Sequence, residues 1–552
     1  MKTKRAIAGA SLGLVLGIPW LALSYAGQRI AKLPLIPVDL FEWITRVLPG
    51  GVVTAGLEIM IQGLHRLNMG STSVLGKALE FAMAYFITLT GLTLAGALFA
   101  LTIDRTRLRW HFSGTIIGIV VWLPALLLAA WGGWGSPGPV IGATWLLAIS
   151  LTWGIILAWG IDTYLITLDS PQDVGRGRTI AGLIASSFVI SGLAVLLPRW
   201  LMATEENERV LEVVTDNGTP IPTKPMEPAP TTPSTQTGFS LVEGTRPEIT
   251  PIDDFYRVDI NLLPPGQEDF QEETDNLAQR LRAQGELDMP AESYLLVIDG
   301  LVENPQALDL NTIRSLPTVS QYATLECISN PVAGDLISTT LFQGARLKDV
   351  LARAHLKPEA ADIKFTCVDG YTESLPLESV NDSRTLLCYA MGNQALTESH
   401  GAPLRLYTPD RFGMKCPKWI IKIEAVGGDY FGYWEKRGWS EQAWVKTTSV
   451  IDTVNKIDPQ LVDVGGIAFA GARGIQKVEL RIDEGAWEPA QIKEPVSPLT
   501  WVLWRAGLSL NAGEHIITVR AIDGTGDVQT ARESSTYPDG ATGYHQMTVN
   551  IS

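Results

Sequence analysis

The chain has 552 residues, of which 46% are hydrophobic and 18% charged, and its formal net charge is -15. This length exceeds one ordinary domain, and a mean hydropathy of +0.15 is high for a purely soluble protein. The negative charge and the lack of a stripe of lysine and arginine exclude nucleic acid as a partner, because phosphate binding needs clustered basic side chains.

The apolar residues are concentrated in the first 200 residues. Ala6 to Gly27, Phe81 to Ile103 and Ile180 to Pro198 each match the ~20 residues that cross a bilayer. The uncharged stretch between His111 and Asp162 is long enough for two crossings, which turn at GGWGSPGP. MKTKR precedes the first run as in a signal peptide, but that run is too long and no A-x-A cleavage site follows it. We therefore expect an α-helical transmembrane bundle of about five helices over residues 1–202.

Basic residues in the short loops predict the orientation of this bundle, because cytoplasmic loops are rich in lysine and arginine. With an odd number of crossings, everything after Arg199 is then extracytoplasmic, and we expect a multi-pass protein of the cell membrane. The loop over residues 28–75 opposes this orientation with four basic residues, but its length and amphipathic pattern weaken the objection. The cytoplasmic markers are Lys2, Lys4, Arg5, Arg105, Arg107, Arg109, Arg176 and Arg178, and the opposing residues are Arg29, Lys32, Arg46 and Arg66.

Three further segments follow the bundle. Residues 203–250 are polar and proline-rich, as in NGTPIPTKPMEPAPTTPSTQTG, and predict an extended linker to a soluble head. Residues 251–454 mix short apolar runs such as YLLVIDGLV with helical segments such as GARLKDVLARAHL, which indicates an α+β domain. Residues 455–552 alternate apolar and polar positions, as in KVELRIDEGAW, which predicts an all-β sandwich.

All four cysteines lie in the predicted head, where disulfides are permitted, and their spacing matches no zinc pattern. Cys327, in TLECISNPVAGD, can be a small buried hydrophobe, half of a disulfide or a ligand of a soft metal. Its polar neighbours favour the ligand. Cys367 and Cys388 can form a disulfide or remain free thiols, and connectivity does not follow from sequence. We expect free thiols there.

Four segments in order resemble the molybdopterin-binding domain of the sulfite oxidase family: TLECISNPVAGDLI, FQGARLKDVL, DGYTESLP and HGAPLRLYTPDRFGMKCPKWI. Upstream, ITPIDDFYRVD resembles that family's entry segment. Downstream, GGIAFAGARGIQKVELRIDEGAW resembles its Ig-like dimerisation domain. The resemblance covers roughly residues 250 to 552 and implies an α+β molybdopterin domain, an Ig-like sandwich and a homodimer.

The resemblance also implies one molybdenum–molybdopterin cofactor per chain, with Cys327 as the metal ligand. A thiolate is a soft, strongly donating ligand that suits a metal which changes oxidation level while an oxygen atom moves. Tyr371 matches an active-site tyrosine that donates a hydrogen bond to an oxo group or a substrate oxygen. Each remaining match is an ordinary loop or core residue when taken alone, and their joint order carries the prediction. The residues expected to bind the cofactor are Tyr256, Arg257, Thr366, His400, Arg405, Lys415, Cys416 and Lys418. Of these, Lys415 and Lys418 would bind the pterin phosphate.

The sequence departs from the family in one stretch. Sulfite oxidases commonly carry an arginine in an A-R-W stretch that binds the anionic substrate, and the matching residues here are Thr340, Leu341 and Phe342. A desolvated dianion would bind poorly without that arginine. A neutral sulfoxide, as in the methionine sulfoxide reductase branch of the family, therefore competes with sulfite as the substrate.

The membrane part offers no sign of its own redox centre. Only His65 and His111 lie there, both outside the apolar runs, so no haem is expected between facing histidines. We predict a membrane-anchored, extracytoplasmic molybdenum oxidoreductase that transfers an oxygen atom and exchanges electrons with a separate cytochrome or quinone-linked protein. The alternative from another class is a non-catalytic surface protein whose Ig-like domain binds a ligand, and the intact Cys327 favours the enzyme.

Overall fold

The computed structural model describes residues 2–67, 72–102, 109–132, 138–169, 185–187, 189–194, 239–261 and 294–551. The chain divides into two compact units. One is formed by residues 1–48 and 77–222, and the other by residues 49–76 and 223–552.

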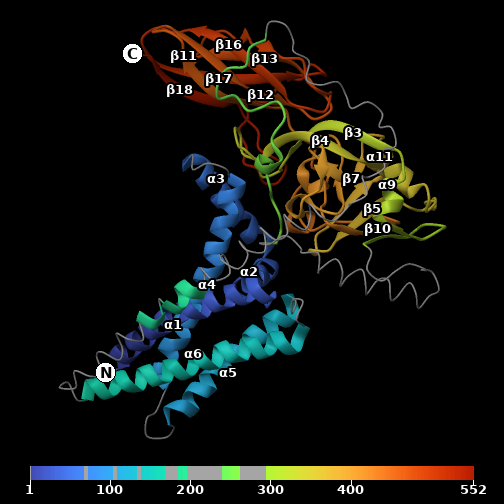
Figure 1. The fold of residues 1–552 in the computed structure, drawn as a ribbon. Coiled ribbons are helices and arrows are strands. Elements are labelled where there is room, and N and C mark those ends of the chain that lie inside the picture. The colour runs from blue at the N-terminus through green and yellow to red at the C-terminus, as the bar shows by residue number, and fades with distance from the viewer. Residues whose placement is uncertain are drawn as a thin grey trace, which may run out of the picture. The chain divides into compact units, whose positions relative to one another are not determined.

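Four helices in the described residues are long and apolar enough to cross a membrane: Lys2–Ala31, Leu75–Thr102, Trp110–Trp131 and Gly138–Thr163. They belong to α1 (Lys2–Ala31), α4 (Thr72–Thr102), α5 (Trp110–Gly132) and α6 (Gly138–Asp169), drawn in blue to cyan in Figure 1. Two shorter helices, α2 (Ile36–Val47) and α3 (Gly50–Leu67), lie between α1 and α4 in the sequence. The helices agree in position, length and composition with four of the expected spans, whereas the fifth, over Ile180 to Pro198, lies largely outside the described residues.

Glycines let the apolar helices approach closely. A Cβ at Gly9 of α1 would lie 2.3 Å from the carbonyl oxygen of Gly96 in α4. A Cβ at Gly154 of α6 would lie 2.5 Å from the carbonyl oxygen of Gly114 in α5. In lipid, where the hydrophobic effect gives no drive between helices, such close contact is a main source of packing energy. The glycine positions therefore account for the pairing of α1 with α4 and of α5 with α6.

Two sheets with short helices confirm the predicted α+β domain. The first sheet has the strand order β2-β1-β10-β5-β6, in which β1 and β10 are parallel and the other pairs antiparallel. The second has the order β3-β4-β7-β8, with β9 paired to β7. The strands are β1 (Leu295–Gly300), β2 (Gln306–Asp309), β3 (Thr318–Glu326), β4 (Ile337–Arg346), β5 (Asp362–Cys367), β6 (Thr372–Pro376), β7 (Leu386–Met391), β8 (Gln394–Ala395), β9 (Arg405–Tyr407) and β10 (Ile420–Val426), and the helices are α9 (Leu310–Arg314), α10 (Leu347–Leu351) and α11 (Leu377–Asn381).

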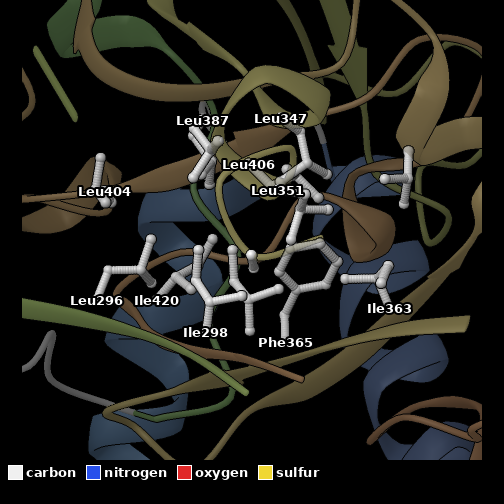
Figure 2. Close-up of a cluster of buried hydrophobic side chains, with 14 of the residues drawn as sticks. Leu296, Ile298, Leu347, Leu351, Ile363, Phe365, Leu387, Leu404, Leu406 and Ile420 are labelled. Carbon is white, nitrogen blue, oxygen red and sulfur yellow. The ribbon is translucent and has the colours of Figure 1, made fainter. Parts of the chain in front are cut away.

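One apolar core joins the two sheets. Ile298 and Phe365 come from the first sheet, Leu351 from α10, and Leu387 and Leu406 from the second sheet, all at most 3% exposed (Figure 2). Each such side chain contributes roughly 1.5–3 kcal/mol by leaving water. The core therefore holds the strand ends and the loops between them in fixed positions.

The C-terminal part consists of two four-stranded antiparallel sheets, ordered β11-β12-β16-β15 and β14-β13-β17-β18. Buried Val464 and Trp504 from the first sheet and Leu480 and Val519 from the second share one cluster, which makes a sandwich. That the sandwich is Ig-like stays a prediction. Its strands are β11 (Thr448–Lys456), β12 (Leu461–Phe469), β13 (Ile475–Ile482), β14 (Glu488–Pro489), β15 (Gln491–Ile492), β16 (Val502–Ser509), β17 (Gly513–Asp523) and β18 (His545–Ile551).

The structure corrects both ends of the predicted domain limits. Residues 239–250, expected to be the end of the linker, pack against the head: Val242 is 5% exposed, and the Trp501 indole donates to the Glu248 carbonyl at 3.0 Å. Glu248 also forms an ion pair with Lys493. The expected limit between residues 454 and 455 falls inside β11, so the sandwich begins at Thr448. The rest of the predicted linker, residues 203–238, lies outside the described residues.

Candidate functional site

Six segments of the second unit surround one cavity of about 840 Å³, its open mouth included. Because most of the segments are loops anchored by buried strand ends, the scaffold fixes their positions. They are the stretch after η1 (Ile252–Asp254), the end of β3 with its following loop, the β5–β6 turn, η2 (Glu398–His400) with β9, η3 (Gly413–Lys415) with the residues after it, and the loops around η4 (Glu435–Arg437).

Cys327 lies on the wall of this cavity, directly after β3. The Cys327 Sγ is 3.1 Å from the Ser329 hydroxyl oxygen, and Cys327 is 8% exposed. Burial raises the pKa of the thiol, whereas the hydrogen bond with Ser329 lowers it. All four cysteines are free and buried, which confirms the expected free thiols at Cys367 and Cys388 and excludes the disulfide alternative for Cys327 in this structure.

The loop after Cys327 is held by its own polar side chains. Asn330 accepts a hydrogen bond from the Leu336 backbone N–H at 3.0 Å and donates to Glu326 Oε1 at 2.9 Å. A Cβ at Gly334 would lie 2.2 Å from Asn330 Oδ1, so only glycine fits there. Burial raises the pKa of Glu326 to about 7. The polar residues that flank the cysteine in the sequence therefore build the loop that presents the thiol.

Arg405 brings a buried positive charge to the cavity. The residue is 4% exposed, and its Nη1 donates to the His400 carbonyl at 3.1 Å. Its Nε is buried without a hydrogen-bond partner, and no carboxylate within the described residues forms an ion pair with it. A buried guanidinium in this state is suited to bind an anionic or oxygen-rich ligand.

His400 is a neutral neighbour of that charge. Its Nε2 lies 3.1 Å from the Ile252 carbonyl oxygen, so the Nε2–H tautomer can donate there. Burial first, and Arg405 second, lower the pKa of His400 to about 4. The side chain is therefore uncharged at neutral pH and serves as a hydrogen-bonding group.

Lys418 supplies a second cation to the cavity, and Asp259 pairs with it. Burial lowers the pKa of Lys418 to about 8, against the opposing effect of Asp259. Asp259 also pairs with Arg257, which does not line the cavity. Sequence reasoning missed Asp259, although it stands two residues after the predicted Arg257 in the same segment.

Two tyrosines and a second cysteine complete the predicted residues found at the cavity. Tyr256 stacks on Phe255 with ring centroids 5.5 Å apart. The Tyr371 hydroxyl donates to the Met414 carbonyl at 2.8 Å, and Cys416 Sγ accepts from the Thr408 N–H at 3.4 Å. Burial raises the pKa of both tyrosines well above the usual value. Each of these groups is therefore neutral and protonated.

Three predicted residues lie away from the cavity wall: Arg257, Thr366 and Lys415. Thr366 is half-buried within β5. Lys415, expected to meet the pterin phosphate, instead places its ammonium group 2.7 Å from Glu373 and 2.5 Å from Glu435. This corrects the prediction, because the charge of Lys415 is already matched by carboxylates that the sequence places far from it.

The cavity is also lined by Trp434 and Trp439, which sequence reasoning did not identify. Both come from the aromatic stretch FGYWEKRGW, and their rings pack edge to face with centroids 6.2 Å apart. The density of aromatic residues in this stretch is the sequence signal that could have found them. The lining therefore combines aromatic rings with the charges of Arg405 and Lys418.

These residues fit a molybdopterin cofactor by their chemistry. The cavity combines two free thiols, of which Cys327 is the predicted ligand of a soft metal, a buried guanidinium with an unpartnered N–H, and neutral donors from histidine and tyrosine. A pterin with a phosphate group needs this combination of cationic and neutral donors.

Residues 284–434 match the family model described as the oxidoreductase molybdopterin binding domain. The chain is similar to sulfite oxidase of Arabidopsis thaliana, with 26% identity over 45% of this chain and 79% of that protein. It is similar to the uncharacterized oxidoreductase YuiH of Bacillus subtilis, with 29% identity over 26% of this chain and 71% of that protein. With human mitochondrial sulfite oxidase the identity is 26%, over 40% of this chain and half of that protein.

Among solved structures, the chain is similar to the sulfane dehydrogenase SoxCD from Paracoccus pantotrophus, with a TM-score of 0.42 and 22% identity over 48% of this chain and 79% of that one. The domain match covers the cysteine loop, Tyr371, Arg405 and the Lys418 loop together. Such a domain implies a cofactor of the molybdenum–molybdopterin type. The chain therefore carries an oxidoreductase molybdopterin binding domain, is similar to sulfite oxidases, and is a molybdenum oxidoreductase.

Proposed function

We propose that this protein is a membrane-anchored, extracytoplasmic enzyme that transfers an oxygen atom to or from a small sulfur-containing substrate. The observation that carries this proposal is the free thiol of Cys327 on the wall of a cavity with a buried, unpaired guanidinium. Similarity to sulfite oxidases supports the sulfur chemistry.

One molybdenum–molybdopterin per chain would supply the two-electron chemistry and accept or donate the oxygen atom. Cys327 would ligate its metal, and Arg405 and Lys418 would neutralise its phosphate and fix its orientation. His400, Tyr256 and Cys416 line the same cavity and would contact the pterin. Tyr371 would donate its hydroxyl proton in a hydrogen bond to the substrate oxygen. Trp434 and Trp439 line the same cavity, and their rings would limit the access of water to the substrate.

The substrate is the second point of this proposal. Thr340, Leu341 and Phe342, which stand where sulfite oxidases commonly carry the substrate-binding arginine, are buried in β4 and do not line the cavity. The Phe342 ring lies under the Arg405 guanidinium, 5.6 Å from its Cζ. This stretch of β4 therefore supplies no cation that could neutralise a sulfite dianion in the cavity. Its composition favours a neutral sulfoxide over sulfite as the substrate.

Steady-state turnover of the purified full chain with an artificial electron mediator tests the substrate class. We expect kcat/KM for neutral methyl sulfoxides, assayed as reduction, to exceed that for sulfite, assayed as oxidation, by at least about tenfold, since an unpaired buried charge costs more than 1.4 kcal/mol. Faster oxidation of sulfite would contradict the preference for a neutral substrate. Turnover of neither compound would contradict the proposed sulfur chemistry.

For its electrons we propose a separate cytochrome or quinone-linked protein, with no haem in this chain. His111 lies in the first turn of α5, near the end of a candidate span, and the other spans carry no histidine in the sequence. A haem held between two facing histidines would need a second one. The homodimer through the C-terminal sandwich stays a proposal from family resemblance.

The side of the membrane on which the head lies depends on the fifth span. With the N-terminus in the cytoplasm, four crossings return the chain to the cytoplasm, whereas a fifth over residues 180–198 places the head outside. A membrane-impermeant maleimide distinguishes these cases in intact cells, and the four native cysteines are buried, so their background is low. We expect Ser234→Cys to be labelled without permeabilisation and Thr106→Cys only after it. Labelling of both variants only after permeabilisation would place the head in the cytoplasm.

A further inference from the structure

Two buried carboxylates share one buried lysine beside the cavity. Lys415 Nζ lies 2.7 Å from Glu373 Oε1 and 2.5 Å from Glu435 Oε1. Glu373 belongs to β6, Lys415 ends η3, and Glu435 begins η4. No side chain of the three is more than 4% exposed. The three groups therefore interact without solvent between them.

The charges of this cluster do not balance when every group is ionised, because two carboxylates face one ammonium group. A buried site with an unmatched charge takes up a proton instead, since desolvation penalises the charged form. Burial raises the pKa of Glu373 to about 8, with Lys415 opposing this shift and Glu435 adding to it. The carboxylate pair therefore holds a proton at neutral pH and releases it just above that range.

Tyr371 connects the cluster to the cavity. Its side chain lines the cavity, and its hydroxyl oxygen lies 3.1 Å from Glu373 Oε2, within hydrogen-bond distance. The same hydroxyl is within 2.8 Å of the Met414 carbonyl, and Met414 also lines the cavity. A chain of hydrogen bonds thus leads from the cavity wall to the carboxylate pair.

Three other titratable groups lie near this chain. Cys367, on β5, faces Tyr371, and burial raises the pKa of its thiol well above the usual value. The Tyr371 backbone N–H donates to Asp369 Oδ1 at 3.0 Å, and the Tyr433 ring packs against the Tyr371 ring with centroids 5.9 Å apart. The Glu373 carboxyl is the titratable side chain at hydrogen-bond distance from the Tyr371 hydroxyl.

We propose that Tyr371, Glu373, Lys415 and Glu435 form a proton relay for the oxygen-atom transfer at the cavity. The inference rests on the proposed function: forming the oxygenated product from substrate and water releases two protons and two electrons, and the reverse reaction consumes them. The electrons pass to or from the redox partner, and the relay carries one of the protons.

The relay moves protons only. In delivery, the O–H bond of the Glu373 carboxyl breaks as its proton passes to the Tyr371 oxygen, and the Tyr371 hydroxyl proton passes to an oxygen in the cavity. Uptake is the reverse. Lys415 keeps the remaining carboxylate neutralised throughout. Glu373 touches neither cofactor nor substrate and acts through Tyr371, so it is a positioning residue.

Infrared spectroscopy of the full chain detects the held proton without any turnover. In the difference spectrum between the wild type and Glu373→Gln, in which the band of Glu326 cancels, we expect a protonated carboxyl C=O band that is lost as the pH rises through about 8. Glu373→Gln removes this band, and Tyr371→Phe shifts it because the variant lacks the hydroxyl bonded to Glu373. The control Glu424→Gln removes a carboxylate that pairs with Lys364 at a site 26% exposed, and it leaves the band in place.

The pH profile of turnover then tests the relay itself. The plot of kcat against pH for the wild type should have a limb near pH 8, where kcat changes with pH. On this limb kcat falls with rising pH if the reaction consumes protons, and rises if the reaction releases them. Glu373→Gln removes the limb and lowers kcat at pH 7 by about tenfold, less than the 10²–10⁴ of direct acid–base catalysis because Tyr371 remains. Glu424→Gln keeps both the limb and the rate.

A carboxyl band that persists in Glu373→Gln, or a pH limb unchanged in that variant, overturns the relay. The glutamine variant is expected to fold, because Lys415 then faces a single carboxylate and the cluster is neutral. If the wild type oxidises or reduces no sulfur compound, the proposed function fails while the infrared titration still gives its own result. A titrating band that Tyr371→Phe shifts then supports the hydrogen-bonded chain, and its absence overturns it.

Discussion

Cys327→Ala lowers turnover by more than about 100-fold, because loss of a metal ligand exceeds the 10–100-fold effect typical of outer groups around a metal. The same variant loses molybdenum on gel filtration, measured by elemental analysis of the purified full chain. Because the Cys327 side chain lines an existing cavity, removing its sulfur opens no new void in a packed core, and the thermal unfolding midpoint should change little. The effect is therefore on the cofactor and not on the fold.

Cys388→Ala is the matched control for this result. Cys388 is a free thiol, fully buried on β7, and it does not line the cavity. The control should keep its molybdenum and more than half of its turnover. If Cys327→Ala behaves like Cys388→Ala, the sulfur of Cys327 is a packing group and its assignment as metal ligand is wrong.

Lys415→Met destabilises the head by about 3–5 kcal/mol at pH 7, the cost of removing one partner from a buried ion pair. Glu373 and Glu435 are then left facing each other with no cation, and folding must bind protons that the unfolded chain does not carry. Carboxyl groups with raised pKa values bind protons more tightly in the folded state, so they favour folding at low pH. The destabilisation by Lys415→Met therefore grows as the pH rises above the ordinary glutamate pKa and shrinks toward pH 5. Urea midpoints followed by tryptophan fluorescence at pH 5, 7 and 8 measure this dependence.

Lys364→Met provides the comparison at a partly exposed pair. Lys364 lies 2.9 Å from Glu424, and the two side chains are 23% and 26% exposed. Such a pair contributes about 0–1 kcal/mol, with little change over this pH range. Equal losses in the two variants, or a Lys415→Met loss that does not shrink at pH 5, would contradict the account of the buried cluster.

The two lysines of RFGMKCPKW show where sequence reasoning reached its limit. Both were expected to meet the cofactor phosphate, yet Lys418 lines the cavity and Lys415 does not. Lys415 ends η3 and Lys418 follows three residues later, and the carboxylates that bind Lys415 come from positions 42 and 20 residues away. A charge pattern within one loop cannot indicate partners contributed by distant strands.

The sequence by itself determined the apolar spans, the α+β and β character of the head, and the cysteine loop, because hydrophobic period and ordered motifs act over short stretches of chain. Four helices apolar and long enough to cross a membrane, the sheets of the head and the free thiol of Cys327 agree with that part. Only the tertiary structure decided which charges are neutralised. Arg405 stays without a carboxylate among the described residues, Lys418 pairs with Asp259, and Lys415 is shared by two glutamates. The physical reason is that ion pairing depends on separations of a few ångströms, which packing sets between residues far apart in the chain.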